Sequence, residues 1–349
     1  MRIRQERIEM KGLFDVFFSR KGEEDPKLAT EQELLLVNGR GKNTWWLKFQ
    51  GETEECVPIA FFYRLNITSI PMGLKAMRLY DSLLTITYNE KVFGCERDYA
   101  LIKNKQHVPS DFLSFEANLS RLEGNFHRLD LYAVVTNGEV NVVMTNPNET
   151  VKKGFLEADG FAASGEEIVS DMVAIDMDCQ GQIRIEGVDR NVKGVAWIEK
   201  RYVEVAKHAA QDTGRHTLGY CLFPKKPCDE RIFVYDVFDE RSEKEKAQAL
   251  VFYSDGTCKN YPAEGIFVNS PQRQKSSRSG KQYPFPAVIR IPQLDREVQV
   301  EPANCEQEMI AEDGIYSEYA GSGKYHGYRK GEPISGRCCI EMIGNFDKL

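Results

Sequence analysis

Residues 128–145 read RLDLYAVVTNGEVNVVMT, with apolar residues at every second position on both sides of an Asn-Gly pair. This pair favours a type I′ turn, because both of its positions tolerate a positive φ. The stretch therefore predicts two antiparallel strands joined by a tight turn, with one face buried. The predicted buried face comprises Leu129, Leu131, Ala133, Val135, Val140, Val142 and Met144.

The same form recurs along the chain. AIDMDCQGQIRIEG (174–187) predicts a hairpin that turns at Gln180-Gly181, and Asp255-Gly256 marks another turn. RIFVYDVF (231–238) and ALVFYS (249–254) predict partner strands across a charged connection. Four further strands are predicted near the end of the sequence: AVIRIP (287–292), REVQVEP (296–302), GIYSEYAG (314–321) and RCCIEMIG (337–344). Short strands at this frequency are typical of all-β barrels or sandwiches.

Few short helices are expected. The best candidate is DFLSFEANLSRLEG (111–124), where apolar residues recur at helical spacing, although a strand fits nearly as well. The segment from about 204 to 229 breaks the strand rhythm and contains two prolines, so the domain boundary is placed there. The prediction is two consecutive β domains, 1–205 and 206–349. The basic, serine-rich stretch 270–281 is expected to be a mobile surface loop.

Composition narrows the classes of function. The 349 residues carry a net charge of -7, which offers no attractive field to nucleic acid. No segment approaches the twenty or so apolar residues of a membrane span, and the charged start lacks the apolar stretch of a secretory signal. We therefore expect a cytoplasmic protein that neither binds nucleic acid nor inserts stably into membranes. Its oligomeric state is left open.

Motifs for metals and cofactors are missing from the sequence. The nine cysteines include no C-x-x-C pair and the five histidines have no metal-ligand spacing. Two glycine-rich stretches, GRGKN (39–43) and GSGK (321–324), lack the full phosphate-loop pattern, and no G-x-S-x-G elbow occurs. Neither a cofactor nor a metal is predicted.

Aromatic residues adjoin charged residues in several predicted strands. In the strand around residue 199, Trp197 and Glu199 share one face, whereas Lys200 and Tyr202 share the other. One of these faces can present a charged group to an enclosed, aromatic-lined pocket for a small molecule. The alternative is that the aromatics fill β cores and the charges lie on wet edges.

Four stretches resemble a known family: KNTWWLKFQG (42–51), MVAIDMDCQGQIRIEGVDRNVKGVAWIEKRY (172–202), RIFVYDVFDERSEKEKAQALVFYSDGT (231–257), and the closing segment from YPFPAVIRIP (283–292) to SGRCCIEMIGNF (335–346). Their order is similar to that in the lipocalin-like superfamily of carotenoid 1,2-hydratase (hydroxyneurosporene synthase), AttH-type proteins, kievitone hydratase and the fungal decalin-forming Diels–Alderases. The resemblance implies two lipocalin-like antiparallel β-barrel or sandwich domains, with a ligand cavity in or between them.

Two departures from the family pattern bear on mechanism. Ile198-Glu199 stands where relatives have His-Asp, and Cys338-Cys339 stands where they have Gly-Tyr, although Glu341 persists. The imidazole that the resemblance would supply for acid–base chemistry is therefore absent. A reaction that depends mainly on shape is favoured.

Three functions are compatible with this sequence. The first is a cofactor-independent cyclase or pericyclase, Diels–Alderase-like, acting on an apolar polyene, polyketide or isoprenoid intermediate of natural-product biosynthesis. The second is a hydratase or isomerase in which a carboxylic acid protonates an isoprenoid alkene. The third is a non-catalytic lipid carrier. In each, the partner is a small apolar molecule. The candidate catalytic residues are Glu199, Lys200, Glu318 and Asp236, and the candidate substrate-binding residues are Trp45, Trp46, Tyr63, Trp197, Tyr202, Tyr316 and Glu341.

Overall fold

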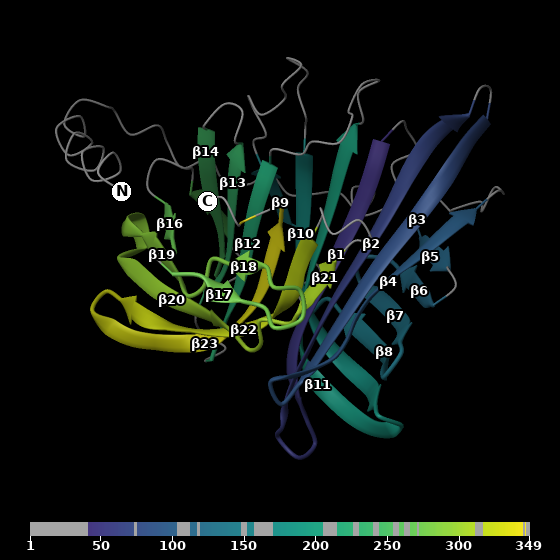
Figure 1. The fold of residues 1–349 in the computed structure, drawn as a ribbon, viewed down its shortest axis with the longest axis horizontal. Coiled ribbons are helices and arrows are strands. Elements are labelled where there is room, and N and C mark those ends of the chain that lie inside the picture. Colours follow the sequence, from purple (N-terminus) through teal and green to yellow (C-terminus); the bar gives the residue numbers. More distant parts are fainter. Residues whose placement is uncertain are drawn as a thin grey trace.

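The computed structural model describes residues 41–72, 75–102, 112–116, 119–147, 152–156, 170–204, 215–225, 230–239, 244–253, 258–261, 266–270, 272–310, 317–344 and 346. Most of them lie in strands, which form two large antiparallel sheets side by side (Figure 1). The prediction of an all-β fold with two lipocalin-like barrels is confirmed. Among the described residues, no helix is long and apolar enough to cross a membrane.

The first barrel is the sheet formed between residues 41 and 204. Its strand order is β4-β3-β2-β1-β11-β10-β8-β7-β6-β5, with β9 beside β10. The sheet curls, so that β3 and β4 contact β7. Its strands are β1 (Gly41–Thr53), β2 (Pro58–Met72), β3 (Lys75–Tyr88), β4 (Lys91–Ile102), β5 (Leu113–Glu116), β6 (Ser120–Gly124), β7 (Arg128–Val135), β8 (Gly138–Thr145), β9 (Lys152–Leu156), β10 (Ser170–Ile185) and β11 (Val188–Glu204).

The second barrel is the sheet formed between residues 215 and 343, in the order β15-β14-β13-β12-β23-β22-β20-β19-β16, with β21 beside β22. Its strands are β12 (Arg215–Pro224), β13 (Arg231–Asp239), β14 (Lys244–Phe252), β15 (Cys258–Tyr261), β16 (Phe267–Asn269), β19 (Ala287–Ile291), β20 (Arg296–Pro302), β21 (Glu308–Ile310), β22 (Ser317–Arg329) and β23 (Glu332–Ile343). A short 3-10 turn, η2 (Pro292–Leu294), precedes β20. The change from one sheet to the other falls between Glu204 and Arg215.

Period-two alternation explains both cores. In β7 and β8 every second side chain is buried, as predicted. The hairpin turns one residue earlier than predicted, at Thr136-Asn137, because Val135 pairs with Gly138, which is already the first residue of β8. These inward residues pack with Trp45, Phe49 and Phe61 in the core of the first barrel. The second barrel has its own core, which includes Tyr220, Val234 and Ile340.

Of the two alternatives considered for 111–124, the helix is wrong and the strand is found. Leu113–Glu116 and Ser120–Gly124 are the strands β5 and β6, paired so that Phe115 lies opposite Leu122. Phe112 and Leu119, which would have completed an apolar helix face, are 39% and 42% exposed. The residues adopt the strand pattern, with a period of two, because this hairpin adds to the edge of an existing sheet.

The turn predicted at Gln180-Gly181 is also wrong, because β10 runs through this pair to Ile185. The hairpin turns at Glu186 and Gly187, whose φ values of 51° and 79° are both positive. The turn predicted at Asp255-Gly256 lies outside the described residues, and the strands that flank it, β14 and β15, pair antiparallel.

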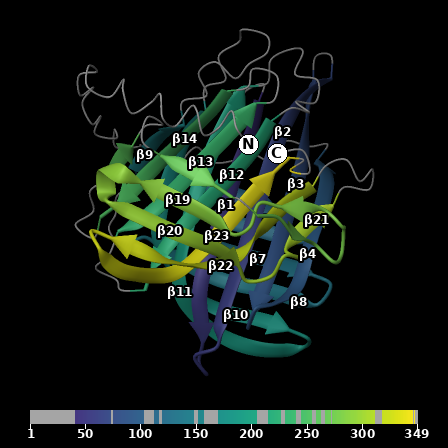
Figure 2. The same ribbon diagram turned by 60° about the vertical axis from the view of Figure 1, so that its left-hand side comes forward.

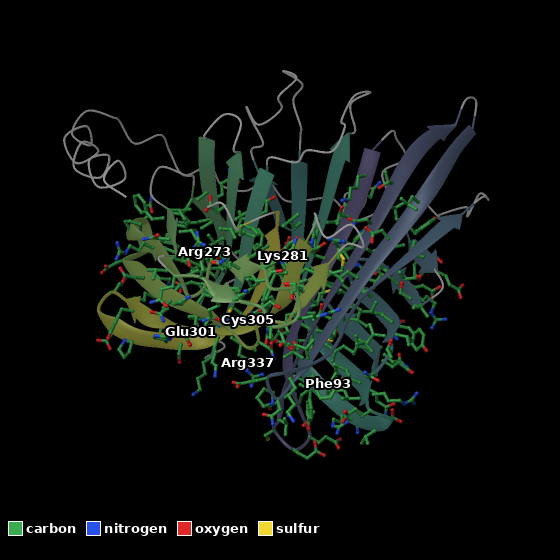
Figure 3. All side chains as sticks on the ribbon, in the orientation of Figure 1. Phe93, Arg273, Lys281, Glu301, Cys305 and Arg337 are labelled. Carbon is green, nitrogen blue, oxygen red and sulfur yellow. The ribbon has the colours of Figure 1, made fainter. Side chains whose placement is uncertain are left out.

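The stretch 270–281 is more ordered than predicted. It contributes to the two-stranded sheet of β17 (Gln274–Lys275) and β18 (Gln282–Tyr283). Ser276 is 1% exposed and hydrogen-bonds to the buried carboxylate of Glu308. Figure 3 labels Arg273 and Lys281, which lie over the second sheet.

Replacing Gly181 by alanine tests the close packing of β10 against β8. A Cβ at Gly181 would lie 2.3 Å from the carbonyl oxygen of Asn141, whereas a Cβ at Gly187 would meet nothing within 4 Å. We expect Gly181→Ala to lower the free energy of unfolding by about 2–4 kcal/mol. The control Gly187→Ala should cost about 1 kcal/mol, from the positive φ alone. Urea denaturation measures both, and equal losses would contradict the packing.

Candidate functional site

The two barrels meet along one surface, which we call the seam. Strands β1, β2 and β3 of the first barrel lie against β22 and β23 of the second (Figures 1 and 2). Side chains that point away from the barrel interiors fill it. The described seam residues include Trp46, Lys48, Gln50, Phe62, Arg64, Leu83, Trp197 and Glu199 from the first barrel, and Cys221, Phe233, Glu318, Ala320, Cys339 and Glu341 from the second.

A charged cluster occupies the seam, formed by Lys48 on β1, Glu199 on β11 and Glu341 on β23. The Lys48 ammonium forms an ion pair with Glu199, and its Nζ lies 3.7 Å from Oε2 of Glu341. All three residues are 0% exposed. Lys48 therefore joins a carboxylate of each barrel away from solvent. We call these three residues the seam cluster.

Aromatic rings surround the seam cluster. Trp197 donates a hydrogen bond from Nε1 to Oε1 of Glu199, at 2.9 Å. Its ring lies edge-on to Phe252, with centroids 4.4 Å apart. The Lys48 ammonium lies 4.7 Å from the ring centroid of Phe233 and 5.8 Å from that of Phe62. Cation–π attraction therefore adds to the ion pairs that hold this ammonium.

A second charged group lies beside the first, along β2 and β3. Arg64 forms an ion pair with Glu318 of β22, and its Nη2 lies 3.6 Å from Oδ2 of Asp81. Asn66 donates to the same carboxylate oxygen at 3.0 Å. The Arg64–Glu318 pair is a second buried ionic connection between the barrels. Lower in Figure 3, Arg337 lies at the junction and donates to the carbonyl oxygen of Gly51.

Two thiols complete this part of the seam. Cys221 and Cys339 are opposite each other on β12 and β23, and both are buried. Gln50 donates to Sγ of Cys339 at 3.2 Å and to the carbonyl oxygen of Cys338 at 2.8 Å. Burial raises the pKa of the Cys339 thiol to about 12 and that of Cys221 well above its usual value. Both are neutral thiols at physiological pH, so they do not supply a thiolate nucleophile.

The structure divides the residues predicted from sequence into three groups. Trp46, Trp197, Glu199, Glu318 and Glu341 lie together in the seam. Trp45 and Tyr63 belong to the core of the first barrel, and Lys200 points the same way, its Nζ 5.9 Å from the Trp45 ring.

Of the remaining three residues, the structure places the side chain of only Asp236. Asp236 faces the interior of the second barrel. Val234, two residues away on the same strand, belongs to that core, and so do the residues of β14 that lie opposite these two positions. The side chain of Tyr202 and all of Tyr316 lie outside the described residues.

Sequence reasoning missed Lys48 and Arg64. Each lies in a strand whose other central residues are apolar or aromatic: TWWLKFQ around Lys48 and FFYRLN around Arg64. A cation at that position is unusual in a strand buried on both faces. The sequence therefore contained a signal for both residues. It could be interpreted only with the knowledge that another barrel covers the outer face of the strand.

A cavity of about 10 Å³ lies in the first barrel, enough for about one water molecule. It adjoins Tyr63, Ser82 and Ser120, whose hydroxyls form a hydrogen-bonded chain. Within the described part of the chain, no cluster of three or more histidine, cysteine or carboxylate side chains has the arrangement of a metal site.

The seam cluster combines groups suited to catalysis without a cofactor. The Lys48 ammonium, together with the N–H of the adjacent Trp197, can stabilise negative charge on an oxygen, and the two carboxylates can exchange a proton. Away from water these effects are stronger, because the local dielectric constant is low.

Comparisons with known proteins agree with this architecture. A family model described as AttH-like matches residues 102–345. A putative AttH from Nitrosomonas europaea has a similar structure, with a TM-score of 0.69 and 14% identity, covering 94% of this chain and 98% of that one. No curated protein sequence matches significantly.

Two further solved structures share the fold. Kievitone hydratase from Nectria haematococca has a TM-score of 0.66 and 13% identity, covering 92% of this chain and 97% of that one. CghA, solved with Sch210972, has a TM-score of 0.55 and 8% identity, covering 93% of this chain and 97% of that one.

Replacing Lys48 by methionine tests the charge balance of the seam. The variant leaves the carboxylates of Glu199 and Glu341 buried without this cation, so we expect the free energy of unfolding to fall by about 3–5 kcal/mol. Its stability should rise as the pH falls, because a protonated carboxyl costs less to bury than a carboxylate. The control Lys324→Met removes an exposed pair with Glu90 and should change little. Similar melting of both variants would show that the seam cluster is not important to folding.

Proposed function

The chain belongs to the AttH-like family, and from this premise we propose that it is an enzyme that needs no cofactor and cyclises an apolar polyene, polyketide or isoprenoid intermediate at the seam. One observation carries the proposal: Lys48, Glu199 and Glu341 converge from both barrels, fully buried, beside Trp197 and Phe233. Charged groups of such burial are costly, and enzymes retain them where their chemistry is used.

The aromatic rings supply the shape that a cyclisation needs. A flexible polyene must be folded so that its reacting carbons approach, and orientation alone can contribute about 7–11 kcal/mol to a barrier. Trp197, Phe233 and Phe252 form a rigid wall for this purpose. The Lys48 ammonium and the Trp197 N–H would polarise a carbonyl group conjugated to the polyene.

Access to the cluster requires motion. Trp197, Lys48 and Glu199 are each 0% exposed, so a substrate reaches them only when the barrels part. The polar connections between the described parts of the barrels include the ion pairs Lys48–Glu341, Arg64–Glu318 and Lys324–Glu90. They also include the hydrogen bonds from Thr87 to Gln307, from Gln50 to Cys338 and Cys339, and from Arg337 to Gly51. In the proposal, substrate replaces these contacts while the two barrel cores stay intact.

A second candidate function is favoured by one feature of the cluster. Glu199 and Glu341 share a single ammonium, so the group can take up a proton and then give it to an alkene. The enzyme would then be a hydratase or an isomerase of an isoprenoid. The two candidates differ in whether a carbon of the product receives a proton from water.

Turnover in D2O separates these reactions. The purified protein is incubated with linear conjugated polyenes that carry a ketone, in the presence of EDTA, and products are identified by mass spectrometry. We expect an isomer of unchanged mass with no deuterium on carbon, as in a pericyclic reaction. Deuterium on carbon would assign an isomerase, and a gain of one water a hydratase. Bound but unaltered polyene, with every compound tested, would identify a carrier and overturn the proposal.

Substitution of Glu199 by glutamine tests its part in the reaction. The amide keeps the size of the side chain but cannot carry a negative charge, so Lys48 and the substrate are held less strongly. We expect kcat to fall by about a hundredfold or more. The matched control is Glu230→Gln, a buried carboxylate of the second barrel that is paired with Arg296, away from the seam. It should affect melting but not kcat. Equal kinetic effects of the two variants would remove Glu199 from the mechanism.

A further inference from the structure

Two of the polar side chains in the interior of the second barrel lie on neighbouring strands, among apolar residues. Tyr220 of β12 is 0% exposed and Asp236 of β13 is 4% exposed. Tyr220 is part of the apolar core, together with Val234 and Met342. Neither residue belongs to the seam, because alternate residues of these strands, Cys221 and Phe233, point there instead.

Strand register brings the two polar side chains together. Tyr220 is opposite Val234, and Leu218 is opposite Asp236, so Tyr220 and Asp236 are diagonal neighbours on the same face. Diagonal neighbours are within reach of a long side chain such as tyrosine. Burial raises the pKa of Tyr220, and the negative charge of Asp236 raises it further, as expected of two groups that are close.

The Tyr220 hydroxyl has no hydrogen-bond partner among the described protein groups. Buried polar groups in folded proteins almost always have one, because an unsatisfied group loses its bonds to water without replacement. The part of the chain that the structure describes therefore contains a buried donor to which it offers no acceptor.

The strand beside this pair has small side chains. Ala247 of β14 is opposite Asp236, and Ala249 is opposite Val234. Both alanines belong to the same core. The neighbouring strand therefore places only small side chains next to the polar pair.

We propose that the second barrel binds a hydroxyl group between Tyr220 and Asp236. A hydroxyl fits both partners, because its oxygen accepts from the Tyr220 O–H and its hydrogen is donated to the Asp236 carboxylate. The apolar core around them suits the hydrocarbon part of an alcohol. The hydroxyl comes either from such an apolar alcohol or from a bound water molecule. This site is separate from the seam and does not depend on the function proposed there.

Tyr220→Phe tests whether the hydroxyl is occupied. If it bonds to a guest hydroxyl, its removal should lower Tm by about 2 °C or more. Tyr283→Phe is the calibrating control, since it removes a hydroxyl that donates to Glu308 within the protein. An unchanged or higher Tm for Tyr220→Phe would overturn the proposal, because removing a truly unpaired buried hydroxyl relieves a cost.

Probe ligands distinguish the two sources of the hydroxyl. 1-Octanol and 1-chlorooctane have similar shapes, but the chloride cannot donate a hydrogen bond. If an alcohol is the guest, the wild-type protein should bind 1-octanol at least tenfold more tightly, and Tyr220→Phe and Asp236→Asn should each reduce this preference. If water is the guest, neither compound binds and Tyr220→Phe still lowers Tm. Equal binding of the two compounds that both variants leave unchanged would contradict a hydroxyl site.

Discussion

The structure depends on one electrostatic constraint: Lys48 is buried and must keep the carboxylates of Glu199 and Glu341 within reach. Glu199 is in the same barrel as Lys48, and Glu341 is in the other barrel. If the barrels separated, Lys48 would lose the carboxylate of Glu341, and water or a ligand would have to take its place. The ion pair therefore links the position of one barrel to the other, and Arg64 with Glu318 does the same on β2 and β22.

Stability does not explain why these charges are kept. The desolvation of two buried ions cancels much of their attraction, and apolar side chains of similar volume would hold the barrels together as well or better. Trp46, Phe62 and Leu83 already do so on the same surface. The charges add what an apolar contact lacks, which is a defined register between the barrels and a set of donors and acceptors. Both are useful to a catalyst whose substrate replaces part of that contact.

Much of the fold could be predicted from the sequence, because alternation and turn residues are local. The hairpin of β7 and β8 is such a case, although its turn lies one residue before the predicted Asn137-Gly138. The prediction failed at Gly181, where glycine serves the close approach of β8 and not a turn, and this requires knowledge of the neighbouring strand. At the site, the alternation correctly placed Trp197 and Glu199 on one face. It could not identify Lys48 as their partner, because their register is set by the pairing of β1 with β11, some 150 residues apart.

The pleat of a strand explains why its charged residues have different surroundings. Glu199 and Lys200 are adjacent in sequence, and the pleat of β11 sends Glu199 to the seam and Lys200 to the interior of the first barrel. Asp236 is likewise separated from Phe233 by the pleat of β13. A sheet that is buried on both faces thus gives each barrel two chemically distinct compartments. Chemistry at the seam can change without disturbing either core, because alternate positions on the same strands serve the two purposes.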